Sequence, residues 1–297
     1  MNRFATLAGK VLSGERFAAG LPLRIGVLVE RRYLAQAQPG GLMAALSNLG
    51  HDLLVIDPEE YVHDTAEDGW LRGLDLVVVR GRSWPVLCLL FWAEARGLAT
   101  VNSRNSISAV HNKAEMAVRL GAGRVPMPQT WFGSLAEMAR QCPAHSYPLI
   151  LKPVFGDNGN GLRVVRDATE LLATDWPEPV VMAQEFLAGS GCDLKLYGIG
   201  DEVWAVRKPA PIYRDAVRSP RAQDQPQLIP VTPDLRALAL RCGELFGLEL
   251  FGVDCAETSG GPVVIEVNDF PNYSAVPGAS EKLAAYVFQR AGQVRAS

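Results

Sequence analysis

The segment from Val263 to Tyr273 constrains the fold of this chain most, because an apolar strand there ends in polar, oxygen-bearing side chains. A second strand-like run, Glu249 to Glu257, comes directly before it. The Ser-Gly-Gly sequence within Thr258 to Pro262 is typical of the tight turn of a β-hairpin. We therefore predict that the two runs pair as antiparallel strands.

The predicted hairpin brings three oxygen-bearing side chains together. A turn centred on Gly260 places Asp254 opposite Glu266, and Asn268 lies on the face of Glu266 because side chains alternate along a strand. Oxygen ligands without Cys or His suit Mg²⁺ or Mn²⁺. Opposed carboxylates with no nearby Lys or Arg repel each other unless a cation lies between them. The pattern therefore favours a metal site over a solvated hairpin face.

Length and charge limit the classes of function. A chain of 297 residues is large for one hydrophobic core, so we expect two or three lobes. A formal net charge of −3 argues against a nucleic-acid-binding protein driven by overall charge. No apolar run of about 18 residues is free of charge and no clear signal peptide precedes the domains, which predicts a cytoplasmic protein without membrane contact. The five cysteines fit neither zinc spacing nor a disulfide framework.

Residues 23–104 predict a small α/β domain with a mostly parallel sheet, because strand-like and helical runs alternate there. The preceding residues 1–22 form a leader to which we assign no function. Arg80 and Arg82 follow a predicted strand, at the edge where open α/β sheets bind ligands. A guanidinium fork fits a carboxylate or phosphate, so both are candidates for an anionic substrate, although solvation of the sheet edge explains them equally well.

A glycine-rich loop follows a predicted strand that ends at Lys152. The loop contains Gly156, Gly159 and Gly161, more glycine than a tight hairpin needs. Glycines let backbone N–H groups approach an anion closely. The loop leads into a strand rather than a helix, so it is neither a Walker A nor a Rossmann sequence. We expect it to cover the phosphates of a nucleotide, with Lys152 as a neighbouring positive charge.

The order of these parts resembles the ATP-grasp superfamily over roughly residues 23–290. The resemblance rests on Lys113 inside a helical segment from Ser103 to Leu120, on Lys152 and its glycine loop, on the stretch Gln184–Leu187 and on the hairpin. It implies an α/β and α+β fold in which two lobes sandwich ATP. The implied domains are a leader (1–22), a pre-grasp α/β domain (23–104), a central lobe with the glycine loop (105–190) and a C-terminal lobe with the metal site (191–297).

The resemblance also implies ATP and Mg²⁺ (or Mn²⁺) as cofactors. By similarity, the two lysines and the glycine loop contact the phosphates, and backbone groups of Gln184–Leu187, the hinge between the lobes, hold adenine. The acidic residue that the family commonly has near Ala188 for the ribose contact is absent, and Asp193 is its substitute. These positions are Lys113, Lys152, Gly156, Gly159, Gly161, Gln184, Glu185, Phe186, Leu187 and Asp193. The implied metal ligands are Asp254, Glu266 and Asn268.

Two branches of the superfamily share features with this chain. The Glu266-Val267-Asn268 pattern and Gly191–Lys195 resemble RimK-type carboxylate–amine ligases, although the Ser-Pro-Gly that follows the Asn in that type is absent. Phe270-Pro271-x-Tyr273 and Lys195–Asp201 resemble the ATP-grasp inositol polyphosphate kinases, which usually have Asp at the position of Glu266. We favour a ligase that joins a carboxylate, through an acyl phosphate, to an amine, in the manner of amino-acid or glutamate ligases. The alternatives are a kinase acting on a hydroxyl of an inositol phosphate or similar polyol and a non-catalytic nucleotide-binding protein.

Cationic side chains beside the implied phosphates are candidates for holding the acceptor. We assign catalytic roles to Lys195, Arg207 and Arg214, with Arg207 the strongest because its strand should project it toward the γ-phosphate. Substrate contacts are assigned to Arg80, Arg82, Arg218 and Tyr273. We expect a small-molecule or peptide anionic acceptor, and the sequence leaves the oligomeric state open, a homo-oligomer included.

Overall fold

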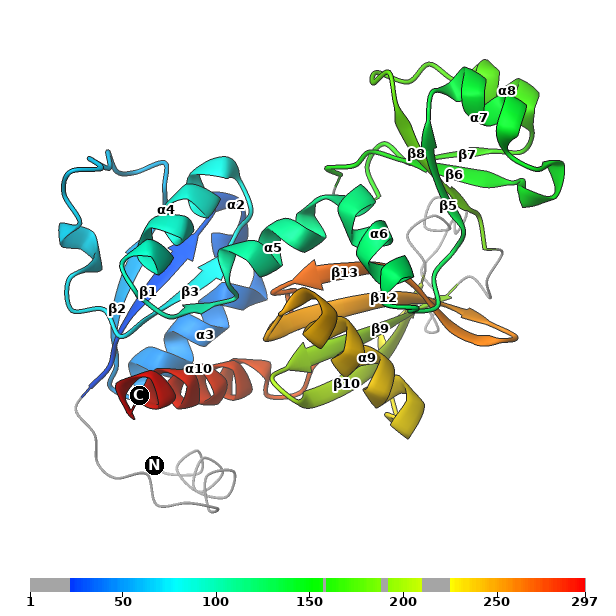
Figure 1. Cartoon of the computed structure of the whole chain (residues 1–297). Helices are drawn as coiled ribbons and strands as arrows, with labels where there is room; N and C mark the ends of the chain where they lie inside the picture. The colour runs from blue at the N-terminus through cyan, green and yellow to red at the C-terminus, as the bar shows by residue number, and fades with distance from the viewer. Residues whose placement is uncertain (1–21, 157–158, 188–191, 210–224, 297) are drawn as a thin grey trace.

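The computed structural model describes residues 22–156, 159–187, 192–209 and 225–296, which form three β-sheets with helices packed on them (Figure 1). Residues 1–21 of the predicted leader lie outside this described part. None of the helices in the described part is long and apolar enough to cross a membrane.

The N-terminal sheet is parallel throughout, with strand order β2-β1-β3-β4. Its central strands are almost fully buried apolar runs, as expected when helices cover both faces of a parallel sheet. The strands are β1 (Arg24–Val29), β2 (Asp52–Ile56), β3 (Leu76–Arg80) and β4 (Thr100–Val101). The connecting helices are α2 (Arg31–Leu34), α3 (Ala37–Asn48), η1 (Gly69–Leu71) and α4 (Trp84–Ala95). The predicted parallel α/β sheet is confirmed.

The second sheet has five antiparallel strands in the order β11-β10-β9-β12-β13. Its strands are β9 (Cys192–Ile199), β10 (Glu202–Pro209), β11 (Gln227–Ile229), β12 (Leu250–Thr258) and β13 (Gly261–Asp269). One face packs against helices in an apolar cluster that includes Val110, Met116, Phe246 and Val253. Those helices are α5 (Arg104–His111), α6 (Lys113–Ala122) and α9 (Pro233–Phe246). The opposite face is apolar at one end, where Tyr197, Ile199 and Leu250 join a second apolar cluster. Further along the same face lie the charged side chains of Lys195 and Asp254.

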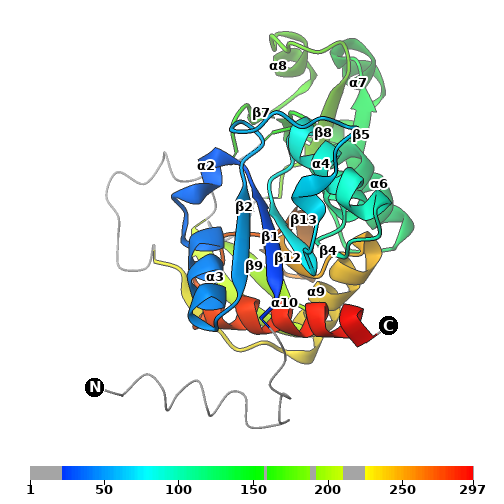
Figure 2. The ribbon, with the colours of Figure 1, turned by 90° about the vertical axis from the view of Figure 1, so that its left-hand side faces the viewer.

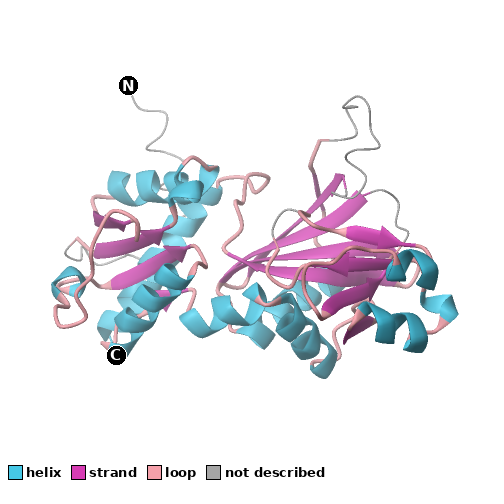
Figure 3. Ribbon diagram, turned by 90° about the horizontal axis from the view of Figure 1, so that it is seen from above, coloured by secondary structure: helices cyan, strands magenta, loops and turns pink. Residues whose placement is uncertain are grey.

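The third sheet is a small antiparallel one with strand order β5-β8-β6-β7. Its strands are β5 (Thr130–Gly133), β6 (Leu149–Lys152), β7 (Arg163–Val165) and β8 (Val181–Glu185). It packs against the short helices α7 (Leu135–Gln141), η2 (Ala144–Ser146) and α8 (Ala168–Leu172). Figure 3 shows the helix-covered parallel sheet on one side of the molecule and the antiparallel strands on the other.

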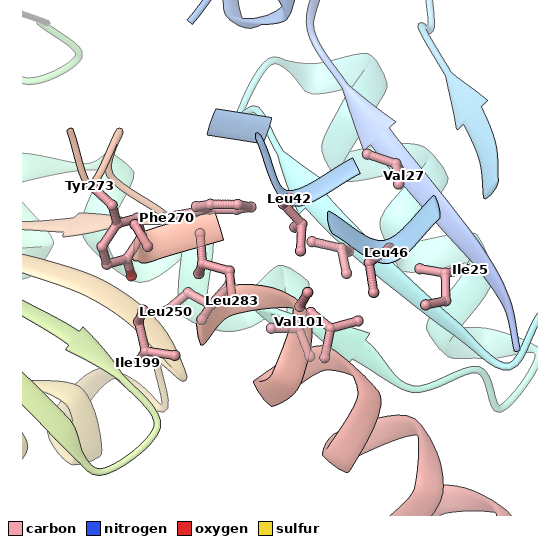
Figure 4. Close-up of a cluster of buried hydrophobic side chains, with 14 of the residues drawn as sticks. Ile25, Val27, Leu42, Leu46, Val101, Ile199, Leu250, Phe270, Tyr273 and Leu283 are labelled. Carbon is pink, nitrogen blue, oxygen red and sulfur yellow. The ribbon is translucent and has the colours of Figure 1, made fainter. Parts of the chain in front are cut away.

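The C-terminal helix α10 (Ala279–Ala296) joins the N-terminal sheet to the five-stranded sheet. Figure 2 shows it running along the foot of the parallel sheet, and Figure 4 shows Leu283 close to side chains from both units. The shared core combines Leu42 and Leu46 of α3 with Ile199 and Leu250 of the five-stranded sheet. Because one apolar core spans the two units, burial of that surface holds them together.

Candidate active site

A cleft of about 680 Å³ lies where the three sheets meet, and residues of all three line it. The N-terminal sheet contributes Arg80, the small sheet contributes Lys152 and Gln184, and the five-stranded sheet contributes Asp254 and Glu266. A cleft of this size accommodates a nucleotide together with a small substrate.

The hairpin of β12 and β13 pairs Asp254 with Glu266, as predicted, but by a different route. At the turn Thr258 pairs with Gly261, so the turn is one residue tighter than a turn centred on Gly260 would be. A register shift between Asp254 and Cys255 then restores the predicted pairing. Two departures from the expected geometry thus cancel at the position that matters for the site.

The register shift also explains which side chains of β13 reach the cleft. The extra residue is Ile265, and both Ile265 and Glu266 line the cleft, while Val264 and Val267 on either side are buried in the apolar core. A β-bulge of this kind breaks the strict alternation of side chains. Asn268 then returns to the cleft side, where its Nδ2 donates to Oδ2 of Asp254 over 2.8 Å.

Asp254 is neutralised by two lysines rather than left opposed to Glu266 alone. Lys195 Nζ contacts its Oδ2 at 2.5 Å, and Lys208 Nζ contacts its Oδ1 at 2.9 Å. Burial would raise the pKa of Asp254, but these two ammonium groups outweigh it and hold the pKa below its usual value. The expectation of a carboxylate pair without nearby cations is therefore wrong, because the neighbouring strands supply the lysines.

Lys113 links the glycine loop to the hairpin. Its Nζ donates to Oε1 of Glu266 at 2.7 Å and to the carbonyl of Gly156 at 2.6 Å. The predicted continuous helix is wrong here, because it breaks at Asn112, whose side chain accepts from the backbone N–H groups of Ala114 and Glu115 and so begins α6. Lys113 is thus the first residue of a helix rather than an interior one.

Lys152 ends β6 and is 7% exposed. Among the described residues it forms no ion pair, and burial lowers its pKa to about 8. An ammonium group without a carboxylate partner, facing a cleft, is suited to an anionic ligand such as a phosphate.

The glycine loop has the backbone that its sequence predicts. Gly159 and Gly161 have φ values of 75° and 76°, in the region that side chains other than glycine rarely adopt. A Cβ on Gly161 would lie 2.8 Å from Cγ of Pro153, so the turn also lacks room for a side chain. Gly156 and Gly159 line the cleft, and residues 157–158 lie outside the described part.

The predicted hinge, Gln184–Leu187, lines the cleft beyond Lys152. The N–H groups of Glu185 and Phe186 already donate to the carbonyls of Gln129 and Pro148, so these two amides are engaged within the protein. The Gln184 side chain is buried, its Nε2 donates to Thr130, and its Oε1 has no partner among the described residues. A buried acceptor without a donor is costly, and an amino group such as that of adenine fits it.

Asp193 lies in the cleft at the start of β9. Burial raises its pKa, against the nearby positive charges of Lys208, Lys195 and Lys152. Its position after the hinge is compatible with the ribose contact that the sequence suggests.

Arg80 and Arg82 line the cleft from the C-terminal end of β3, as expected. The Arg82 guanidinium lies 3.9 Å from Oδ1 of Asp269, whose pKa is raised by burial. The Arg80 guanidinium lies 3.9 Å from the centre of the Tyr33 ring. The arginines therefore belong to the same cavity as the lysines.

Two expected site residues point elsewhere. Arg207 lies on the opposite face of β10 and binds Glu257 through two hydrogen bonds of 2.8 Å, so the prediction that it projects toward the γ-phosphate is wrong. The period of two along the strand gives that direction to Lys208 instead.

Tyr273 is fully buried in the core, and its hydroxyl donates to the carbonyl of Gly198 at 2.7 Å. The expectation that it contacts a substrate is wrong, because no part of its side chain is accessible. Arg214 and Arg218 lie outside the described residues.

A protein-family model described as a RimK-like ATP-grasp domain matches residues 112–282, more than half of the chain. The chain belongs to the RimK-like ATP-grasp family. Proteins described as probable alpha-L-glutamate ligases are among its relatives. The one from Pseudoalteromonas translucida is 27% identical over 282 residues, covering 88% of this chain and 92% of that protein. One from Vibrio cholerae is 26% identical over 282 residues, with the same shares of 88% and 92%.

Solved structures share the fold. The RimK domain ATP-grasp protein from Sphaerobacter thermophilus aligns with a TM-score of 0.70 and 20% identity, covering 89% of this chain and 98% of that one. The ATP-grasp ligase PsnB, complexed with the precursor peptide PsnA2 and AMPPNP, aligns with a TM-score of 0.69 and 18% identity, covering 93% and 99%. The predicted ATP-grasp fold is confirmed.

With the family, the class of enzyme is confirmed too: the chain is an ATP-dependent carboxylate–amine ligase that uses ATP and Mg²⁺. The residues of the cleft suit the binding of ATP together with Mg²⁺. Asp254 is held as a carboxylate, and Glu266 and Asn268 add oxygen atoms from the neighbouring strand. Among the described residues, no group of three or more His, Cys, Asp or Glu side chains could hold a metal ion. Two carboxylates and an amide suit Mg²⁺, which retains water and binds substrate phosphates rather than filling a protein cage.

Sequence reasoning missed three residues of the cleft. Lys208 has no role in the sequence prediction, although its alternation with Arg207 along the strand is a usable signal. Asp269 directly follows Asn268 in the motif and was not considered. Gln36 comes from a short connection between helices, and no local pattern marks it.

Proposed function

We propose that the enzyme joins the carboxylate of an amino acid, or of a peptide that ends in or carries glutamate, to an amine. Its relatives described as alpha-L-glutamate ligases support this acceptor. The observation that carries the proposal is the composition of the cleft: phosphate-binding candidates, Lys113 and Lys152, share one cavity with the arginines Arg80 and Arg82 of the N-terminal sheet. Arginines suit carboxylates because the guanidinium fork matches both oxygens.

In this mechanism the acceptor carboxylate attacks the γ-phosphorus of ATP and ADP leaves, which produces an acyl phosphate. The amine then attacks the carbonyl carbon, and inorganic phosphate leaves with the oxygen that linked it to carbon. Lys113, Lys152 and the amides of the glycine loop stabilise the charge that develops on the leaving ADP. Lys208 and Lys195, which reach the cleft from β10 and β9, would offset the negative charge of the transferred phosphoryl group.

Asp254, Glu266 and Asn268 would hold Mg²⁺, which neutralises the phosphate oxygens and orients them for transfer. For those oxygens to bind a cation, Lys195, Lys208 and Lys113 must give up contacts that they make with the carboxylates in this structure. The released ammonium groups are then available to the phosphates.

We further propose the division into a pre-grasp domain (23–104), a central lobe (105–190) and a C-terminal lobe (191–297), and a cytoplasmic location. The location is supported by the need for ATP and by Cys88, Cys142, Cys242 and Cys255, which are all free thiols. The acceptor is a small anionic molecule or a peptide.

The test is release of inorganic phosphate by the purified protein with ATP and Mg²⁺. Acids, glutamate-bearing peptides and cyclitols are supplied singly, each with and without a pool of amino acids. We expect phosphate only where a carboxylate and an amine are both present. ADP formed with a polyol alone, without free phosphate, would instead make the protein a kinase.

A further inference from the structure

Most cationic side chains that line the cleft have a carboxylate partner within the protein. Five of them form ion pairs: Lys113 with Glu266, Lys195 and Lys208 with Asp254, Arg82 with Asp269, and Arg32 with Glu30. Among the described residues, no such partner exists for Lys152 or for Arg80. Lys152 lies beside the glycine loop, where phosphates are expected, so Arg80 is the cation left without an assigned ligand.

The Arg80 guanidinium is held in place before any ligand binds. It is 9% exposed and lies over the Tyr33 ring, 3.9 Å from the centre, with the Phe270 ring centre at 5.7 Å. Such stacking of a cation on aromatic faces is favourable. Its Nη2 donates to Oε1 of Gln36 at 3.2 Å, which fixes the rotation of the plane.

The hydrogen bonds of Arg80 are incomplete. A guanidinium carries five N–H donors. Nε is buried and has no acceptor among the described residues, and no acceptor there receives a bond from Nη1. Asp269 attracts Arg80 electrostatically but forms its ion pair with Arg82. A buried cation with unused donors is costly unless a counter-ion completes it. Because Arg80 also lines the cleft, a ligand carboxylate can complete it.

We propose that Arg80, positioned by Tyr33 and Gln36, binds a carboxylate that does not react, carried by one of the two substrates that the enzyme joins. The inference rests on the proposed function and narrows its substrates. Either the activated acid has a second carboxylate, as a dicarboxylic amino acid has, or the amine substrate is an amino acid with a free carboxylate. Phe270 follows Asn268 by two residues, so this subsite adjoins the end of the strand that carries the metal-ligand candidates.

The two sources are separated by substrate analogues. For the acid, L-glutamate is compared with glutamine and isoglutamine, in each of which one carboxylate is an amide. For the amine, amino acids are compared with the corresponding amines that lack the carboxylate. Wild type, Arg80→Gln and Arg80→Lys are titrated with each probe by calorimetry, in the presence of a non-hydrolysable ATP analogue, and KM values are measured with ATP.

We expect wild type to prefer the carboxylate form of one substrate over its analogue by about 10- to 100-fold, the range for a hydrogen-bonded charge pair. Arg80→Gln should bind both forms equally weakly, and Arg80→Lys should recover part of the preference. Binding of the ATP analogue should be unchanged in both variants. Arg31→Gln is the matched control, since Arg31 is an exposed arginine of the same unit, paired with Asp57 and Glu60, and does not line the cleft.

Retention of the wild-type preference by Arg80→Gln, in a protein with a normal melting curve, would overturn the inference. Failure of wild type to bind any of the carboxylates would overturn it as well. Failure of the proposed function looks different: carboxylates would still bind in an Arg80-dependent manner, but no combination of acid and amine would release phosphate from ATP.

Discussion

The two walls of the cleft differ in how their charges are balanced. On the wall formed by the five-stranded sheet, Lys195 and Lys208 neutralise Asp254, so that wall is complete within the protein. The other two sheets form the second wall, on which Lys152 and Arg80 are buried and form no ion pair among the described residues. The first wall can keep its shape without a ligand, because its charges are paired. The second wall bears the cost of buried charge that ligand anions remove.

This difference assigns separate tasks to the two walls. Binding of ATP, and of the substrate that carries the non-reacting carboxylate, should depend most on the cations without ion-pair partners. Chemistry should depend most on the wall with paired charges, where lysine contacts must be exchanged for contacts with the metal ion and the phosphates.

Replacement of Glu266 by Gln removes a carboxylate from the wall formed by the five-stranded sheet. It should have the largest effect on turnover. The amide keeps a hydrogen-bond acceptor for Lys113 but removes the charge that a metal ion requires. We expect turnover to fall by about 100- to 1,000-fold, the range for loss of one electrostatic contribution to a transition state. The measurement is phosphate release as a function of Mg²⁺ concentration, together with a thermal melt.

Glu257→Gln is the matched control, because Glu257 lies on the same hairpin but binds Arg207 on the other face. Its turnover should stay near that of wild type. Full activity of the Glu266→Gln enzyme would remove Glu266 from the metal site.

Replacement of Lys152 by Met removes a charge from the other wall. We expect the affinity for ATP to fall by about 10- to 100-fold, as for loss of a hydrogen bond between charged groups, while the fold is retained. Direct titration with ATP measures the change. An unaltered dissociation constant would show that the phosphates do not contact Lys152.

The pH dependence of stability gives a second reading of Lys152. Its pKa is lowered from 10.5 to about 8 by burial, so between these pH values the unfolded chain binds more protons than the folded one. The folded state should therefore gain stability as pH rises through this window, by about 3 kcal/mol for a shift of this size. Lys152→Met should lack this gain. Denaturant unfolding of wild type and Lys152→Met at pH 7.5 and 10 gives the free energy of unfolding at each pH. An equal change in that free energy between the two pH values in both proteins would contradict the burial of Lys152.

Replacing Lys208 or its neighbour Arg207 compares the two faces of β10, because Lys208 lines the cleft and Arg207 lies on the other face. Lys208→Met should lower kcat/KM by about tenfold, because it removes a cation beside Asp254, in the range of one charged hydrogen bond. Arg207→Met should change kcat/KM by less than about twofold, since the ion pair of Arg207 with Glu257 is partly exposed and lies away from the cleft. Steady-state assays of both variants provide the comparison. The reverse order of effects would restore the direction that the sequence suggested for Arg207.

Tyr273→Phe tests the core beneath the cleft and should affect activity least. The change removes the hydroxyl that donates to Gly198, which costs about 1–2 kcal/mol of unfolding free energy in a buried setting. We expect a lower denaturant midpoint and kcat within about twofold of wild type. A large loss of activity with unchanged stability would show that the Tyr273 hydroxyl acts on the substrate.

The sequence predicted the parts of the site that depend on local patterns. The opposition of Asp254 and Glu266 follows from an apolar strand pair and a Ser-Gly-Gly turn. The glycine loop is similarly local, since Gly159 and Gly161 adopt the left-handed backbone that their residue type permits. The α/β alternation of residues 23–104 predicted the parallel sheet for the same reason.

The remainder depends on contacts between segments far apart in the chain. Lys195 and Lys208 reach Asp254 only because β9 lies between β10 and β12, an order that no local pattern specifies. The stacking of Arg80 on Tyr33 joins the end of β3 to helix α2. The side on which Arg207 lies depends on which residues of β10 face the cleft. Because side chains alternate along a strand, an error of one residue in this assignment turns every side chain to the other face.

The central claim is that a carboxylate is activated by phosphoryl transfer in this cleft. The most direct measurement is the fate of ¹⁸O from a substrate carboxylate labelled at both oxygens, after turnover with ATP, Mg²⁺ and an amine. An acyl phosphate intermediate places one labelled oxygen in the released inorganic phosphate, and we predict that mass spectrometry finds it there. Phosphate free of label, or label in AMP, would contradict the account.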